Sequence, residues 1–137
     1  MIFLKDLGEN LFVLDGIRPV AMTAAEYNVR ANGTHNTAAE IDLADYNYPK
    51  EILIQVTVGL VASGGTLDLD VESGTATAAL TNTDHSFTQI TAAGVATYHY
   101  TPTRRFINVE ATVATAAVTF SVTLIMGALG WGSSGQA

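Results

Sequence analysis

The sequence contains no cysteine and few basic residues. Without thiols the chain can form neither a disulfide framework nor a thiolate metal site. The six Lys and Arg residues never form a run, and with thirteen Asp and Glu residues the formal net charge is −7. Such a protein repels nucleic acid phosphates and anionic membrane surfaces, so we expect neither nucleic acid nor membrane among its partners.

Long apolar runs are also missing. The first residues, Met1-Ile2-Phe3-Leu4, are apolar, but Lys5 and Asp6 follow at once. A signal peptide needs a basic segment before an uninterrupted apolar stretch of about 7–15 residues, and a membrane span needs about 20. We therefore expect the protein to be made in the cytoplasm and used without translocation.

Charged residues make up only 14% of the 137 residues, where about a quarter is typical of a soluble domain. Hydrophobic residues account for 48%. A chain of this length forms one domain and buries enough surface for a single core. So low a charge content indicates that another protein covers part of the surface.

Apolar residues alternate with polar ones in four segments, which is the pattern of a strand with one buried face. Taken at every second residue, the apolar positions span Ile52–Val58, Leu67–Val71, Ile107–Val113 and Val118–Met126. Weaker strand patterns lie near residues 25–31, 38–43, 77–82, 86–91 and 95–101. Eight or nine strands separated by Gly and Pro turns predict an all-β, antiparallel β-sandwich of jelly-roll or immunoglobulin type, and we expect the jelly-roll.

The two ends of the chain differ from this middle part. Residues 1–22 hold short apolar pieces separated by Gly8 and Gly16 and closed by Pro19, which we interpret as an N-terminal arm with one or two short strands. Residues 130–137 are small and polar except for Trp131, which indicates a flexible C-terminal tail. The sandwich domain is then expected over residues 23–129.

Three carboxylates alternate along one predicted strand, at Asp68, Asp70 and Glu72. Alternate side chains stand about 6.5–7 Å apart, which suits the acid and base of an inverting glycosidase, and three carboxylates can also bind Ca²⁺. Two neighbours on one flat strand cannot flank a substrate from opposite sides, however. We expect a solvated outer face, with a calcium site as the alternative.

The other reactive residues form no preorganised site. Residues 83–86 (Thr-Asp-His-Ser) have the residue types of a hydrolase triad, but neighbours in sequence cannot converge on one reacting atom. His35, His85 and His99 lack the spacing that pairs two metal ligands. We predict that the protein is not an enzyme and has no catalytic residue, metal or cofactor.

Tyrosines occur in two pairs, Tyr46 with Tyr48 and Tyr98 with Tyr100, each spaced to lie on one face of a strand or loop. Such pairs either pack in a core or interface or form a flat platform for a sugar ring, and we expect packing. The adjacent pair Arg104-Arg105 should point to opposite faces. One arginine is expected to pair with a carboxylate and the other to meet solvent or a partner.

From Ala62 to Gly127 the sequence resembles a family of small proteins encoded among the head genes of tailed phages. The resemblance consists of four strand patterns in a fixed order. They are GGTLDLDVES (64–73), VATYHY (95–100), RRFINV (104–109) and VTFSVTLIMG (118–127). Members of the family often continue with Pro and Arg after the last Gly, whereas this chain continues with residues 128–131, ALGW.

The resemblance implies a head decoration, or cement, protein without catalytic residues that binds the outside of the capsid and strengthens the shell. It implies two partners, the major capsid protein and further copies of the chain, commonly in a trimer, and a place on the outer surface of the virion. An N-terminal arm can add a strand to an exposed sheet edge. Candidate interface residues are Ile2, Phe3, Leu4, Leu11, Phe12, Arg18 and Trp131. The alternative is a carbohydrate-binding or host-recognition module of a phage tail or fibre, which predicts exposed, roughly coplanar tyrosine rings.

Overall fold

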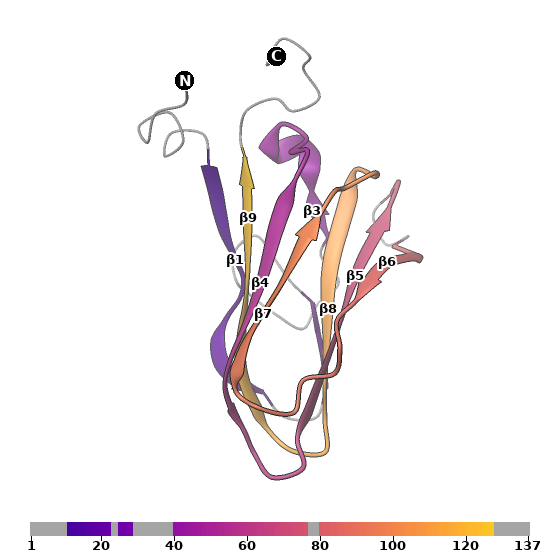
Figure 1. Cartoon of the computed structure of the whole chain (residues 1–137). Helices are drawn as coiled ribbons and strands as arrows, with labels where there is room; N and C mark the ends of the chain where they lie inside the picture. The colour runs from indigo at the N-terminus through magenta and orange to yellow at the C-terminus, as the bar shows by residue number, and fades with distance from the viewer. Residues whose placement is uncertain (1–10, 23–24, 29–39, 77–79, 128–137) are drawn as a thin grey trace.

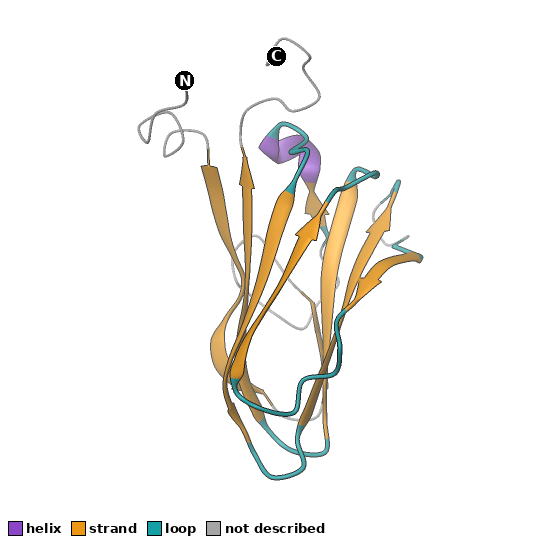
Figure 2. Ribbon diagram, viewed as in Figure 1, coloured by secondary structure: helices purple, strands orange, loops and turns teal. Residues whose placement is uncertain are grey.

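The computed structural model describes residues 11–22, 25–28, 40–76 and 80–127. Within these ranges the chain forms nine strands and one short 3₁₀-helix, η1 (Figures 1 and 2). The elements are β1 Leu11–Met22, β2 Ala25–Asn28, β3 Ile41–Asp42, η1 Leu43–Tyr46, β4 Ile52–Val61, β5 Thr66–Gly74, β6 Asn82–Ser86, β7 Gly94–Tyr100, β8 Phe106–Ala114 and β9 Val118–Gly127. The predicted all-β class is confirmed.

The strands build two antiparallel sheets that pack face to face. Sheet A has the order β1-β9-β4-β7, and sheet B has the order β2-β8-β5-β6, with β3 also paired to β8. Because β2 pairs with residues 110–113 of β8 and β3 with residues 106–107, the two short strands share one strand position. The pairs β1–β9, β2/β3–β8, β4–β7 and β5–β6 are thus nested, as in a long hairpin that has been rolled up. This is the jelly-roll topology, so the predicted sandwich type is also confirmed.

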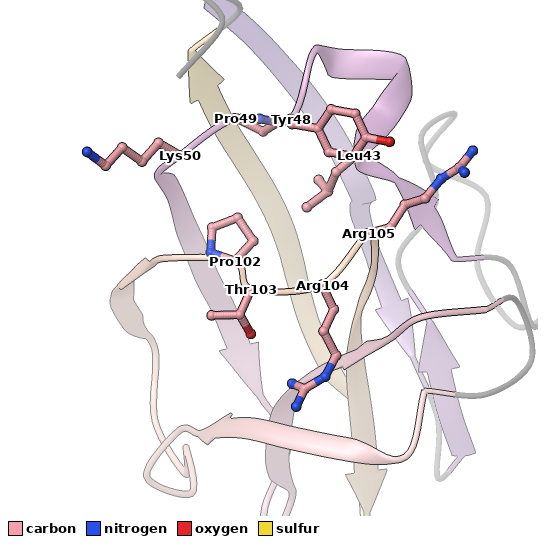
Figure 3. A pocket seen from close by; sticks show the side chains of 8 residues that line it. All are labelled: Leu43, Tyr48, Pro49, Lys50, Pro102, Thr103, Arg104 and Arg105. Carbon is pink, nitrogen blue, oxygen red and sulfur yellow. The ribbon is translucent and has the colours of Figure 1, made fainter. Parts of the chain in front are cut away.

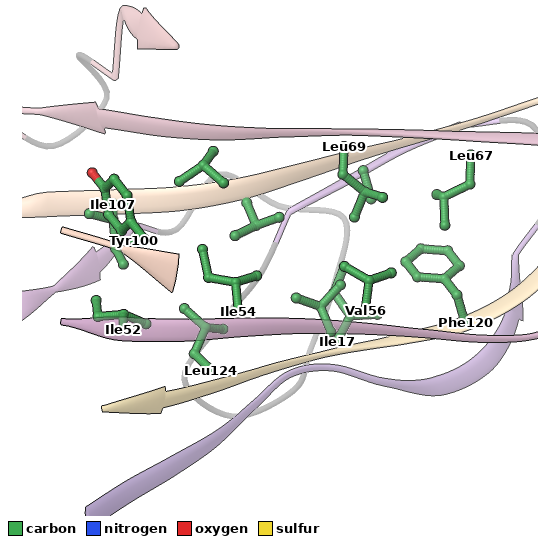
Figure 4. Packing of buried hydrophobic residues seen from close by; sticks show 14 of the residues in the cluster. Ile17, Ile52, Ile54, Val56, Leu67, Leu69, Tyr100, Ile107, Phe120 and Leu124 are labelled. Atoms are coloured by element: carbon green, nitrogen blue, oxygen red, sulfur yellow. The ribbon is translucent and has the colours of Figure 1, made fainter. Parts of the chain in front are cut away.

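The hydrophobic core lies between the two sheets (Figure 4). Every second residue of β4 and β5 faces inward, and Ile52, Ile54, Leu67 and Leu69 are at most 1% exposed. Burial of each such side chain contributes about 1.5–3 kcal/mol. Among the described residues the buried set is hydrophobic except for Ser73 and Asn108.

Strand β1 belongs to the sandwich, which therefore begins before residue 23, where the sequence predicts its start. Residues 11–22, which the sequence analysis assigns to an arm, pair with β9 along its length, and Ile17 and Met22 are buried in the core. The register shifts on both sides of Ile17, so the apolar residues do not keep a period of two. Instead of the one or two short strands expected in the arm, residues 11–22 form a single strand of 12 residues that belongs to the sandwich. Residues 1–10 and 128–137 lie outside the described part of the chain.

The two ends of the sandwich are built differently (Figure 1). At one end the β4–β5 and β8–β9 turns lie together, and the Ala62 amide donates to the Ala117 carbonyl at 2.9 Å. The opposite end carries η1 and the β7–β8 loop. Asp42 caps η1 by accepting from the Ala44 amide at 3.0 Å, and the left-handed residue Asn47 ends it. The sequence patterns did not predict this helix, which is only four residues long.

Candidate functional site

A pocket of about 400 Å³ opens at the end of the sandwich that carries η1 (Figure 3). Its lining is Leu43, Tyr48, Pro49, Lys50, Pro102, Thr103, Arg104 and Arg105. It therefore gathers three of the six Lys and Arg residues of the chain. Their charged ends point away from one another, however, so the pocket offers an apolar floor and not a convergent anion site.

Arg105 is fixed by a two-pronged contact with the carboxylate of Asp42. Its Nε donates to Oδ1 and its Nη2 donates to Oδ2, each at 2.9 Å. The hydrogen bond from Arg105 holds the pKa of Asp42 below its usual value, and the same bond raises the pKa of Arg105. The contact ties the start of β8 to β3, which is 63 residues away in the sequence.

Arg104 belongs to a separate polar network at the same end. Its Nη1 donates to Ser73 Oγ at 3.1 Å and lies 3.5 Å from Asp84 Oδ1, while Tyr100 Oη donates to Asp84 Oδ2 at 2.6 Å. Tyr100 is only 2% exposed, and its burial, together with the hydrogen bond to Asp84, raises its pKa well above the usual value. The network joins β7 of sheet A to β5 and β6 of sheet B. Both arginines thus pair with a carboxylate, where one was expected to.

An aromatic cluster closes the side of the sandwich between β6 and β7. The His85 and Tyr98 rings are stacked with centroids 3.6 Å apart, and Phe87 lies edge-on to both, at 5.1 and 6.2 Å. With Tyr98 stacked on His85 and Tyr100 buried, this pair does not form an exposed platform. Of the histidines, His85 and His99 lie on different sheets, and His35 is outside the described residues.

The first tyrosine pair also fails to form a flat platform. Tyr46 packs edge-on against Phe12 with ring centroids 5.1 Å apart, and desolvation raises its pKa. Tyr48 is 52% exposed and has a left-handed φ of 49°. The two rings of this pair therefore have different environments.

The outer face of sheet B is acidic. Asp68, Asp70 and Glu72 project from β5, and Glu110 of β8 lies directly opposite Asp70. Asp68 accepts from Gln89 Nε2 at 3.0 and 3.1 Å. In the described ranges no group of three or more His, Asp or Glu residues is arranged to hold a metal ion.

The outer face of sheet A has the opposite character. Strands β4, β7 and β9 contain no Asp, Glu, Lys or Arg at any position. We call their outward residues the neutral face: Leu53, Gln55, Thr57, Val95, Thr97, His99, Thr119, Ser121, Thr123 and Ile125. At its rim His99 Nε2 lies 3.6 Å from Glu51 Oε2. No sequence motif signals this face, because it appears only when the three strands are placed side by side.

Of the predicted interface residues, the structure describes three, and all three lie in β1. Ile2, Phe3, Leu4 and Trp131 lie outside the described residues. Leu11 and Arg18 lie in β1, and Leu11 is paired with Gly127. Phe12 is 37% exposed at the same end of β1.

Comparisons with family models, with curated proteins and with solved structures find no match. Within the described ranges no helix has the length and apolar content needed to cross a membrane. Function is therefore inferred from the fold, its surfaces and their chemistry.

Proposed function

We propose that the chain is a structural, non-catalytic protein of a tailed-phage particle that binds the outside of the capsid and stabilises the shell. The observation that carries the proposal is the jelly-roll strand order, because this topology recurs in viral capsid domains. The four segments that resemble phage head proteins coincide with β5, β7, the start of β8, and β9. The resemblance therefore lies in the strands of the sandwich and not in its loops.

A protein that binds the assembled capsid, and not its separate subunits, stabilises the shell. A protein that binds neighbouring capsid subunits, but not dissociated ones, stabilises the assembly by about 2.7 kcal/mol per site at a concentration 100 times its dissociation constant. Several copies joined to one another add avidity without new contacts. The proposed partners are accordingly the major capsid protein and further copies of this chain, on the outer surface of the virion.

Jelly-roll domains also include lectins, so a carbohydrate-binding module of a tail or fibre is the competing proposal. Such a module needs exposed, roughly coplanar aromatic rings. Tyr100 is 2% exposed and Tyr98 is stacked on His85, which counts against a platform at that pair. The geometry therefore favours the capsid role.

The proposal is tested by mixing the purified chain with heads of its own phage that have been produced without it. We expect saturable co-sedimentation and a rise in the temperature at which packaged DNA becomes accessible to an intercalating dye. Heads that already carry the protein are the matched control, because their sites are occupied. Absence of binding at tens of micromolar, with binding to glycans instead, would establish the competing function.

A further inference from the structure

We propose that the neutral face of sheet A is the contact surface for a second copy of this chain, with the same face of both copies packed together about a two-fold axis. The result is a dimer, in place of the trimer that the resemblance to phage head proteins implies. The inference deepens the proposed function and rests on it, since it names the surface through which copies of a particle protein associate. It is carried by the distribution of charge and exposed apolar side chains over the two sheets.

The neutral face carries no Asp, Glu, Lys or Arg residue. The net charge of −7 makes two copies repel each other in most orientations. Strands β4, β7 and β9 carry none of that charge, whereas β5 and β8 carry four carboxylates. Interface cores are depleted in charged residues in the same way.

Apolar side chains are exposed on sheet A, in the neutral face and beside it. Val95 of the neutral face is 62% exposed, and Leu60 near the end of β4 and Val13 of the adjacent strand β1 are 65% and 61% exposed. No large hydrophobic side chain on sheet B is comparably exposed among the described residues. Packing of sheet A against another surface would remove this apolar area from water.

The threonines of the neutral face lose little side-chain entropy when they are buried. Thr57, Thr97 and Thr123 on the neutral face are β-branched, so one rotamer is already preferred before contact. Burying them therefore loses less rotamer freedom than burying Lys or Glu would. Their hydroxyls can also donate to one another across the contact.

The neutral face has the size of an interface core. Its three strands, about 4.8 Å apart and up to about ten residues long, cover roughly 14 by 33 Å. That footprint is a little over half of the roughly 800 Å² of accessible surface that each partner buries in a standard interface, so the rim of the contact extends over neighbouring residues such as the exposed Leu60 and Val13. Two sheets packed in this way would lie about 10 Å apart, as in a β-sandwich.

The choice of a second copy as the occupant follows from electrostatics. Two-fold packing places each residue near its own counterpart or near neighbours on the same face. On sheet B this would bring Asp70 and Glu110 of one copy against the same carboxylates of the other, and like charges at close range repel. On strands β4, β7 and β9 of sheet A the same operation brings together no Asp, Glu, Lys or Arg residue.

The experiment measures the mass of the full chain by light scattering after gel filtration, at concentrations from 1 to 100 micromolar. We expect about twice the 14.4 kDa of one chain. Thr57→Arg, in the middle strand of the neutral face, should raise the dimer dissociation constant about 100-fold or more, because it sets two like charges in the contact. Thr112→Arg, on the outer face of sheet B, is the matched control and should leave the mass unchanged.

Cross-linking keeps the inference testable even if an arginine variant fails to fold. The chain has no cysteine, so Thr57→Cys and Thr112→Cys each introduce a single thiol. A short bis-maleimide should join two copies of the first variant and not of the second. A wild-type chain that stays monomeric at 100 micromolar, or an oligomer that Thr57→Arg leaves intact, overturns the inference. Head binding by such a monomer would still support the proposed function, so the two can fail separately.

Discussion

Replacing Tyr100 by Phe tests the polar network that joins the two sheets. The substitution removes only the hydroxyl that donates to Asp84 at 2.6 Å, and the phenyl ring still fills the buried site. A hydrogen bond to a charged group contributes about 1.5–3 kcal/mol, so we expect the free energy of unfolding to fall by about 2 kcal/mol at pH 8. Urea denaturation followed by circular dichroism measures this difference. Tyr48→Phe, at a position 52% exposed, is the control and should change stability by less than about 0.5 kcal/mol.

The same variant should alter the pH dependence of stability. Burial and Asp84 raise the pKa of Tyr100 above its usual value of 10.0. The resulting stabilisation is fully present below pH 10 and is lost as the pH rises, because the unfolded chain then releases a proton that the folded chain keeps. The stability of the wild type should fall about 1.4 kcal/mol per pH unit above pH 10 through this group alone. Tyr100→Phe lacks that loss, so the gap between the two proteins should narrow from pH 10 to 11. A gap that is absent at pH 8, or constant up to pH 11, would refute the reasoning.

Two further predictions concern single positions. Arg105 lowers the pKa of Asp42 from its usual 3.8, so this pair stabilises the fold above the unfolded pKa, and the effect is lost as the pH falls through the lower folded pKa. The urea midpoints of wild type and Asp42→Asn should differ at pH 7 and approach each other as the pH falls below 3.8. A Cβ at Gly65 would lie 3.0 and 3.1 Å from two backbone oxygens, so Gly65→Ala should destabilise the protein by about 1–3 kcal/mol. Gly59→Ala, whose Cβ would lie 3.9 Å from the nearest atom, should cost less than about 0.5 kcal/mol in thermal unfolding. Equal effects at the two glycines would contradict the steric argument.

Regular alternation made four of the strands predictable from the sequence. Inward residues of β4, β5, β8 and β9 recur with a period of two, and the structure buries them as predicted. Segments that break the period were misjudged. Bulges in β1 concealed its length and its place in the sandwich, so only one or two short strands of an arm were predicted there. Residues 86–91 contribute only the last residue of β6 and a single bridge from Ile90 to Leu67.

The polar contacts could not be predicted because their partners are distant in the sequence. Arg104 reaches back to Asp84 and Ser73, 20 and 31 residues earlier, and Arg105 reaches back to Asp42. Which carboxylates lie within reach depends on how the β7–β8 loop passes between the sheets. The neutral face depends on strand order in the same way, since β4 and β9 are neighbours only in the folded chain.

The nested strand order has a consequence for how the chain acquires its structure during synthesis. Strand β9 lies between β1 and β4, and β8 lies between β5 and the short strands β2 and β3. Of the strand pairs in the structure, a nascent chain that ends before residue 106 can therefore form only β4–β7 and β5–β6. Strand β1 then lacks β9, the strand with which it pairs. Such late, long-range pairing is slow, on the order of milliseconds to seconds, and leaves strand edges open to aggregation. We therefore expect the two sheets to form together, once β8 and β9 have left the ribosome. A chain released before that point should be unfolded and a substrate for chaperones or proteases, not a smaller folded domain.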